Sequence, residues 1–163
     1  MKYAELKLND VANCPGIGVS FFVQGCPHHC QGCFNQETWD YEGGKEFTPN
    51  TLNSIITGLQ ANGIHRDLNI LGGEPLCPEN LFLTHMVIKA VKDALPNTKV
   101  YIWTGYLYED LIKRKDRTDQ ILELADILID GPYIQAERDI TLPMRGSRNQ
   151  RIINLREVYH EKA

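Results

Sequence analysis

The stretch GVSFFVQGCPHHCQGC, residues 18–33, joins a buried strand to a cysteine-rich loop, and the interpretation of the fold begins there. Residues 18–23 are mostly aromatic or β-branched, which is typical of a strand. The loop that follows carries Cys26, Cys30 and Cys33 in the spacing C-x3-C-x2-C. In parallel α/β folds, ligands bind outside the carboxyl ends of the strands. The stretch therefore predicts an α/β protein with clustered thiols at a strand end.

Outward from this stretch, short β-rich runs alternate with segments of helical periodicity. This order predicts a parallel sheet covered by helices. There are too few units for an eight-stranded barrel. We therefore expect an α/β fold, either a partial, open (βα) barrel or a small open sheet, in a single domain over residues 1–163. The expected elements are a helix with Thr48 as its cap that ends near Gly63, a strand over 68–71, a helix from about Pro78 to Pro96, a strand over 100–103, one or two short helices within 108–125, and a strand over 127–129.

The composition argues against nucleic-acid binding, secretion and a membrane span. The 163 residues are 42% apolar, enough for a core without disulfides, and the net charge is −4. A mildly acidic chain has no global attraction to nucleic acid. The charged first ten residues and the lack of a long apolar run predict neither a signal peptide nor a membrane span. We therefore expect a cytoplasmic protein whose thiols stay reduced and act as metal or redox ligands.

The three cysteines alone leave two kinds of metal site open. Structural zinc takes four ligands, and His28, His29, Cys14 or Cys77 could supply the fourth. Iron–sulfur clusters usually take four thiolates, so three would leave one iron without a protein ligand. In a catalytic cluster, that iron is where a substrate can coordinate. The loop is short enough to wrap a cubane cluster.

A second motif, Gly72-Gly73-Glu74-Pro75, follows the strand expected at 68–71. Paired glycines let a backbone approach a ligand closely, and the Glu74 carboxylate favours a ligand ammonium. Alone, this motif is equally well explained as a simple turn. At the same sheet edge as the three cysteines, it favours S-adenosylmethionine, which offers an ammonium, a carboxylate and a sulfonium.

These motifs resemble those of the radical S-adenosylmethionine superfamily. Further residues are similar to those of one family within it, the activating proteins of anaerobic ribonucleotide reductase. The resemblance implies a [4Fe-4S] cluster that cleaves S-adenosylmethionine, and a 5′-deoxyadenosyl radical that removes hydrogen from a backbone glycine of the large reductase subunit. It also implies a flavodoxin-like electron donor. The further residues lie in 22–28, 32–35, 38–39, 103–106, 129–131 and 145–150.

The resemblance also implies roles for individual residues. It makes Cys26, Cys30 and Cys33 the cluster ligands. It places Gly32, Cys33 and Phe34 beside the adenine, and gives Gly72, Gly73 and Glu74 the methionine ammonium. Thr104 and Asp130 end later strands, where they either hold the cofactor or a cation or merely cap the strands.

Two other functions stay open: a radical enzyme acting on a small molecule of the deazaguanine type, and a zinc-binding module without enzymatic activity. The arginine-rich segment 135–163 is either a solvated surface or a docking site for an acidic patch. One of His28 and His29 could tune the cluster by hydrogen bonding, but we expect both to be solvated loop residues. We expect Trp39 and Trp103 to belong to the core rather than to serve as cofactor platforms.

Overall fold

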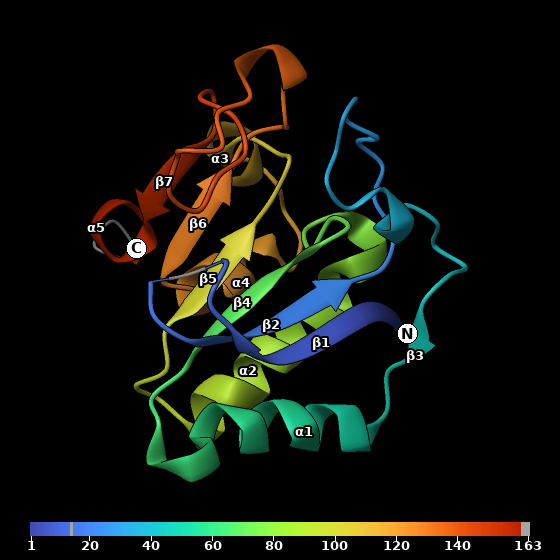
Figure 1. Ribbon diagram of the computed structural model, residues 1–163. Coiled ribbons are helices and arrows are strands. Elements are labelled where there is room, and N and C mark those ends of the chain that lie inside the picture. The colour runs from blue at the N-terminus through green and yellow to red at the C-terminus, as the bar shows by residue number, and fades with distance from the viewer. Residues whose placement is uncertain (14, 161–163) are drawn as a thin grey trace.

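A computed structural model describes residues 1–13 and 15–160 of the chain. Cys14, considered above as a metal ligand, lies outside the described residues. The fold is a mixed α/β structure around one open sheet of seven strands (Figure 1). The strands are β1 (Lys2–Asp10), β2 (Gly18–Val23), β3 (Lys45–Glu46), β4 (Asp67–Gly72), β5 (Val100–Trp103), β6 (Ile127–Asp130) and β7 (Arg151–Asn154), and the α-helices are α1 (Pro49–Gln60), α2 (Leu81–Ala94), α3 (Tyr108–Leu111), α4 (Thr118–Leu124) and α5 (Leu155–Val158).

The sheet order is β3-β1-β2-β4-β5-β6-β7. The four central strands β2, β4, β5 and β6 are parallel, as the strand–helix alternation predicted. The outer strands β1, β3 and β7 are antiparallel to their neighbours and were not expected. β3 and β7 are the edge strands, β3 pairs with β1 only at Lys2 and Tyr3, and about half of the residues of β1 and β7 are exposed. Their sequences therefore lack the continuous apolar runs that identify central strands.

Successive side chains of the central strands point to opposite faces of the sheet. One set, which includes Phe21, Ile70 and Ile102, joins the apolar core with residues of α1, α2 and α4. These helices cover that face of the sheet (Figure 1). Phe22, Leu71 and Trp103 belong to the alternate set and line a cavity on the other side. The sheet thus separates the apolar core from the cavity.

The helix boundaries follow from local chemistry. Thr48 caps α1 through a reciprocal pair of bonds with Thr51, and Pro49 occupies the first helical position, as predicted. The second helix begins later than predicted, at Leu81, because Pro78–Asn80 form a separate 3-10 turn.

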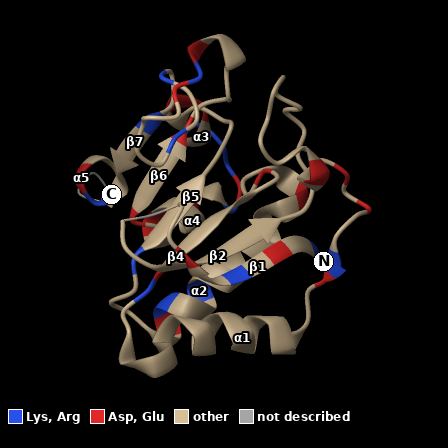
Figure 2. Cartoon of the chain, in the orientation of Figure 1, with Lys and Arg blue, Asp and Glu red and all other residues tan. Residues whose placement is uncertain are grey.

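Charged residues of both signs are interspersed over the described part of the chain (Figure 2). No helix within residues 1–13 and 15–160 is long and apolar enough to cross a membrane.

Candidate active site

A cavity of about 440 Å³ opens at the carboxyl ends of the central strands. Its wall contains all three cysteines of the C-x3-C-x2-C loop, and Gly72, Gly73 and Glu74 from the end of β4. Thr104 and Gly105 follow β5 and complete that side. Residues of the arginine-rich C-terminal region form another part of the wall. The cavity lies in the size range of small-molecule sites.

The cysteine loop leaves β2 through a tight turn at Gly25. This glycine has φ +101°, and a Cβ there would lie 2.2 Å from the ring of Tyr41. The amide of Gly25 donates to the carbonyl of Thr38 at 2.6 Å, and the amide of Cys26 donates to the carbonyl of Trp39 at 3.2 Å. The ring of His29 stacks on Trp39 with 4.5 Å between centroids. The segment after the cysteines thus folds back and supports the start of their loop.

The three thiols lie in the wall of one cavity. Burial raises the pKa of Cys26 to about 11 and also raises that of Cys30, so a bound cation is needed to stabilise their thiolates. Among the described residues, no three His, Cys, Asp or Glu side chains converge on one point that could hold a single metal ion. Mononuclear zinc needs such convergence, with each sulfur about 2.3 Å from the metal. In a cubane, each thiolate binds its own iron. Three thiols in one cavity wall are the donor set of a cubane cluster with one open iron, so the residues present fit that group.

The paired glycines are required by close packing of β4 against the cysteine loop. A Cβ on Gly73 would lie 2.2 Å from the carbonyl oxygen of Gly25, and one on Gly72 would lie 2.8 Å from that of Val23. The amide of Gly73 donates to Val23 at 3.0 Å, and the amide of Glu74 donates to Gly25 at 2.8 Å. The buried Asn80 side chain donates to the Gly25 and Glu74 carbonyls as well. The two motifs thus form one rigid unit.

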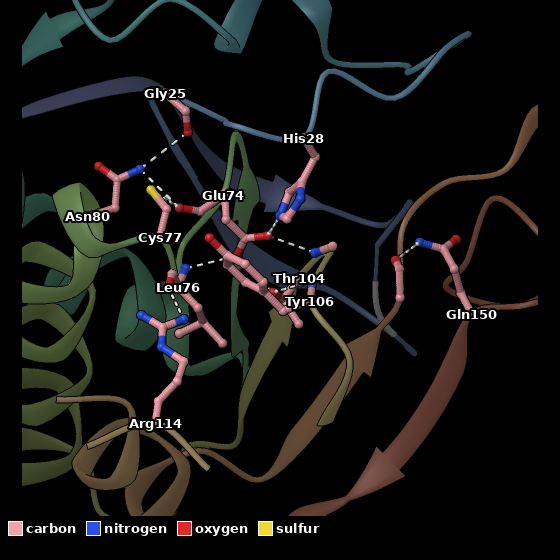
Figure 3. A network of polar contacts seen from close by, with 12 residues as sticks. Gly25, His28, Glu74, Leu76, Cys77, Asn80, Thr104, Tyr106, Arg114 and Gln150 are labelled. Carbon is pink, nitrogen blue, oxygen red and sulfur yellow. Dashed lines mark hydrogen bonds and ion pairs between the residues drawn. The ribbon is translucent and has the colours of Figure 1, made fainter. Parts of the chain in front are cut away.

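The Glu74 carboxylate is the centre of a buried network (Figure 3). Its Oε1 accepts from the amide of Gly105 at 2.7 Å and lies 2.6 Å from Nε2 of His28. Because a carboxylate only accepts, Nε2 of His28 carries the proton. Oε2 of Glu74 accepts from the amide of Leu76 at 2.8 Å and from the hydroxyl of Thr104 at 2.8 Å.

This network bears on the expected contact with a ligand ammonium. A carboxylate has about four lone-pair sites, and groups of this chain use all four on Glu74. A direct bond from an ammonium would have to replace or share one of them. Glu74 contributes negative charge to the cavity wall, while its bonds hold the turns after β4 and β5 together.

His28, Trp39 and Trp103 lie in surroundings that differ from those expected from the sequence. The expectation that His28 is a solvated loop residue is wrong, because its ring is mostly buried against Glu74. The expectation that Trp39 and Trp103 belong to the core is also wrong. Both rings are partly exposed and line the cavity, and Nε1 of Trp103 donates to the carbonyl of Met144 at 2.6 Å. Only the proximity of His28 to the cysteines hinted at these roles.

Asp130 and Phe34 are placed differently from the other candidate residues. The fully buried Asp130 accepts from the amide of Tyr108 at 2.8 Å and is ion-paired with Arg151, so its carboxylate points away from the cavity lining. Phe34 lines the cavity, but its side chain is exposed. Its ring contacts Tyr133 at 5.2 Å between centroids, and the guanidinium of Arg138 lies 5.3 Å above it. Phe34 therefore lies at the mouth of the cavity.

Comparison with known proteins adds independent evidence. Residues 12–153 match the family model described as a 4Fe-4S single cluster domain. The chain is similar to the anaerobic ribonucleoside-triphosphate reductase-activating protein of Vibrio cholerae, with 37% identity over 151 residues, 92% of this chain and 96% of the relative. The protein of that name from Escherichia coli K12 is 33% identical over 157 residues, 96% of this chain and 100% of the relative. The one from Enterobacteria phage T4 is 35% identical over 154 residues, 93% of each chain.

Proposed function

This chain belongs to the family of anaerobic ribonucleoside-triphosphate reductase-activating proteins, and on that basis we propose how it works. In this proposal, its substrate is a backbone glycine of the large subunit of the reductase. Cys26, Cys30 and Cys33 would hold a [4Fe-4S] cluster, which would supply the electron for cleavage of S-adenosylmethionine to methionine and a 5′-deoxyadenosyl radical. Transfer of a hydrogen atom from the glycine to that radical would give a glycyl radical and 5′-deoxyadenosine.

The ligand set of the cavity carries this proposal. Cys26, Cys30 and Cys33 line the cavity, whereas the remaining described cysteine, Cys77, is buried with its thiol donating to the carbonyl of Glu74 at 3.2 Å. Three available thiolates would hold three irons of a cubane cluster and would leave the fourth iron without a protein ligand, open to S-adenosylmethionine. A ligand set with one open iron supports catalysis rather than a purely structural role.

The chain's own residues prepare the cavity for this chemistry. The Gly72–Gly73 turn brings backbone close to the cysteine loop, and Glu74 holds that turn against Thr104 and His28. Trp39 and Trp103 form aromatic walls that limit water around a reactive radical. We propose that Gly32, Cys33 and Phe34 flank the adenine, with Phe34 at the mouth.

The open edge of the sheet is compatible with a bulky protein substrate. We propose that the sheet is a short version of the barrel of radical S-adenosylmethionine enzymes, formed by residues 1–163 as one domain, and that its open side admits a loop of the reductase. A flavodoxin-like protein would supply the electron. The cytoplasm, where thiols stay reduced, is the compartment that suits this chemistry.

The test is anaerobic reconstitution with iron and sulfide, followed by dithionite, S-adenosylmethionine and the large reductase subunit. We expect about four irons per chain, because the donor set fits one cubane cluster. We also expect 5′-deoxyadenosine and a glycyl-radical doublet in the EPR spectrum of the reductase. Cys30→Ala should lose the cluster and the product, whereas the matched variant Cys77→Ala should keep its iron.

Three results would contradict the proposal in different ways. Tightly bound zinc without iron would favour a structural module. Iron without 5′-deoxyadenosine would refute cofactor cleavage. Formation of 5′-deoxyadenosine without the doublet would point to a small-molecule substrate.

A further inference from the structure

The segment Arg145–Gln150 forms a loop that is fastened to the end of β6. Oε1 of Gln150 accepts from the amides of Gly146 and Ser147 at 2.9 and 3.1 Å. Its Nε2 donates to the carbonyl of Gly131 at 3.0 Å (Figure 3). Asn149 donates to the carbonyl of Pro132 at 2.7 Å. The amides of this loop therefore serve to hold it in place beside the cavity.

Arg145 is the residue of this loop that has a buried side-chain donor without a hydrogen-bond partner among the described residues. Its side chain lines the cavity, and Nη1 donates to the carbonyl of Gln150 at 3.1 Å. Nε is buried and has no hydrogen-bond partner. Among the described residues, no carboxylate forms an ion pair with it. A buried donor without a partner is costly, and a guanidinium matches a carboxylate in geometry and charge.

We propose that Arg145 binds the carboxylate of the methionyl group of S-adenosylmethionine. This assignment rests on the proposed function, because it concerns the cofactor of the same cavity. The carboxylate is the only anionic group of that cofactor, and a backbone glycine of a protein substrate carries no charge. With Glu74 and Arg145 in its wall, the cavity presents both charges that a zwitterionic amino acid requires.

Lys7 is the other basic residue of the cavity wall, and it is less suited to this role. Its side chain is exposed, and its ammonium lies 5.4 Å from the centroid of the Phe22 ring. An exposed, strongly hydrated ammonium discriminates less between ligands than a partly buried guanidinium. Lys7→Gln is therefore the variant that tests the alternative partner.

The experiment compares two ligands on the reconstituted cluster-containing protein by anaerobic titration calorimetry. The ligands are S-adenosylmethionine and its decarboxylated form, which keeps the sulfonium and the amine. For Arg145→Gln, we expect the Kd for S-adenosylmethionine to rise about 10- to 100-fold, as for a lost charge-assisted hydrogen bond, and the Kd for the decarboxylated ligand to change less than about threefold. Arg148→Gln removes an exposed arginine of the same loop and should change neither value.

Each other outcome overturns the assignment. The assignment is refuted if Arg145→Gln binds S-adenosylmethionine as tightly as wild type, or if it loses affinity equally for both ligands. It is also refuted if Lys7→Gln, and not Arg145→Gln, weakens binding of S-adenosylmethionine alone. Circular dichroism and iron content report whether Arg145→Gln is folded. If it is not, Arg145→Lys, which keeps the charge but not the planar fork, should weaken binding of S-adenosylmethionine alone, and unchanged binding refutes the assignment. If the wild-type protein binds no S-adenosylmethionine and forms no 5′-deoxyadenosine, the proposed function is wrong. If the wild-type protein binds S-adenosylmethionine and Arg145→Gln binds it equally well, only this inference is wrong.

Discussion

Replacing Glu74 with glutamine should destabilise the metal-free protein, although the two side chains have the same shape. The carboxylate is buried and accepts from two backbone amides, one on each oxygen. A glutamine amide keeps one acceptor oxygen and places an NH2 where the other oxygen was. His28 can change its tautomer and Thr104 can rotate its hydroxyl to accept from that NH2. The amides of Leu76 and Gly105 cannot, so either orientation of the glutamine leaves one of them without a partner.

The magnitude follows from these bonds. An unsatisfied buried amide costs about 1–3 kcal/mol, and each bond that loses a charged acceptor is weakened by up to about 1 kcal/mol. Glu74→Gln should therefore lower the free energy of unfolding by about 3 kcal/mol, a large part of the typical 5–15 kcal/mol of a native domain. For a chain of this size, the melting temperature should fall by about 6–12 °C.

Urea unfolding of the metal-free chain under reducing conditions, followed by tryptophan fluorescence, measures this effect. Glu123→Gln, an exposed substitution on α4, is the matched control and should change stability by less than about 0.5 kcal/mol. If Glu74→Gln were as stable as the control, the four bonds would not hold the turns together. Glu74 would then be free to serve a ligand alone.

Three further substitutions test other parts of the structure. Gly73→Ala should unfold the protein or lower its stability by at least about 2 kcal/mol, because the new Cβ would lie 2.2 Å from the carbonyl oxygen of Gly25. Asp130→Asn should lower stability by about 1–3 kcal/mol and leave the Kd for S-adenosylmethionine within about twofold, since this buried carboxylate serves an ion pair outside the cavity. Lys92→Met should lower stability by about 1–3 kcal/mol at neutral pH, because Lys92 donates to the buried Asp126. Burial works against ionisation of Asp126, but hydrogen bonds from Lys92 and its other partners outweigh burial and lower the pKa of this carboxyl. The stability that this pair contributes is therefore present above about pH 4, and the difference between wild type and variant should shrink as pH falls through the lowered pKa.

Each of these predictions has its own control. Gly63→Ala has open space around the new Cβ and should cost only about 1 kcal/mol for its positive φ, so an equal effect of Gly73→Ala would contradict the packing argument. A stable Asp130→Asn with weakened cofactor binding would place Asp130 in the site after all. A constant difference between wild type and Lys92→Met from pH 7 down to pH 2, measured by urea unfolding, would rule out a role for the ionisation of Asp126.

The central strands could be predicted because they are buried on both faces. Residues 18–23 and 68–71 are mostly apolar, with only Gly18, Ser20 and Asn69 as exceptions, and such runs are typical of buried central strands. Strand β1 (Lys2–Asp10) is half exposed and pairs with β3 only at Lys2 and Tyr3, and its many polar residues leave it without the continuous apolar run that marks a central strand. The antiparallel pairing of β7 with β6 depends on a return of the chain that no local pattern encodes.

The sequence by itself identified the family and predicted the three cluster ligands. Three cysteines within eight residues must lie close together, because the covalent chain permits little else, and this makes their spacing informative without a fold. The partners of Glu74 lie on the cysteine loop and at the end of β5, 46 and 30 residues away. Only the register of the parallel strands brings them together. The tertiary structure therefore decided that Glu74 binds its own chain, that Asp130 faces Arg151, and that Arg145 faces the cavity.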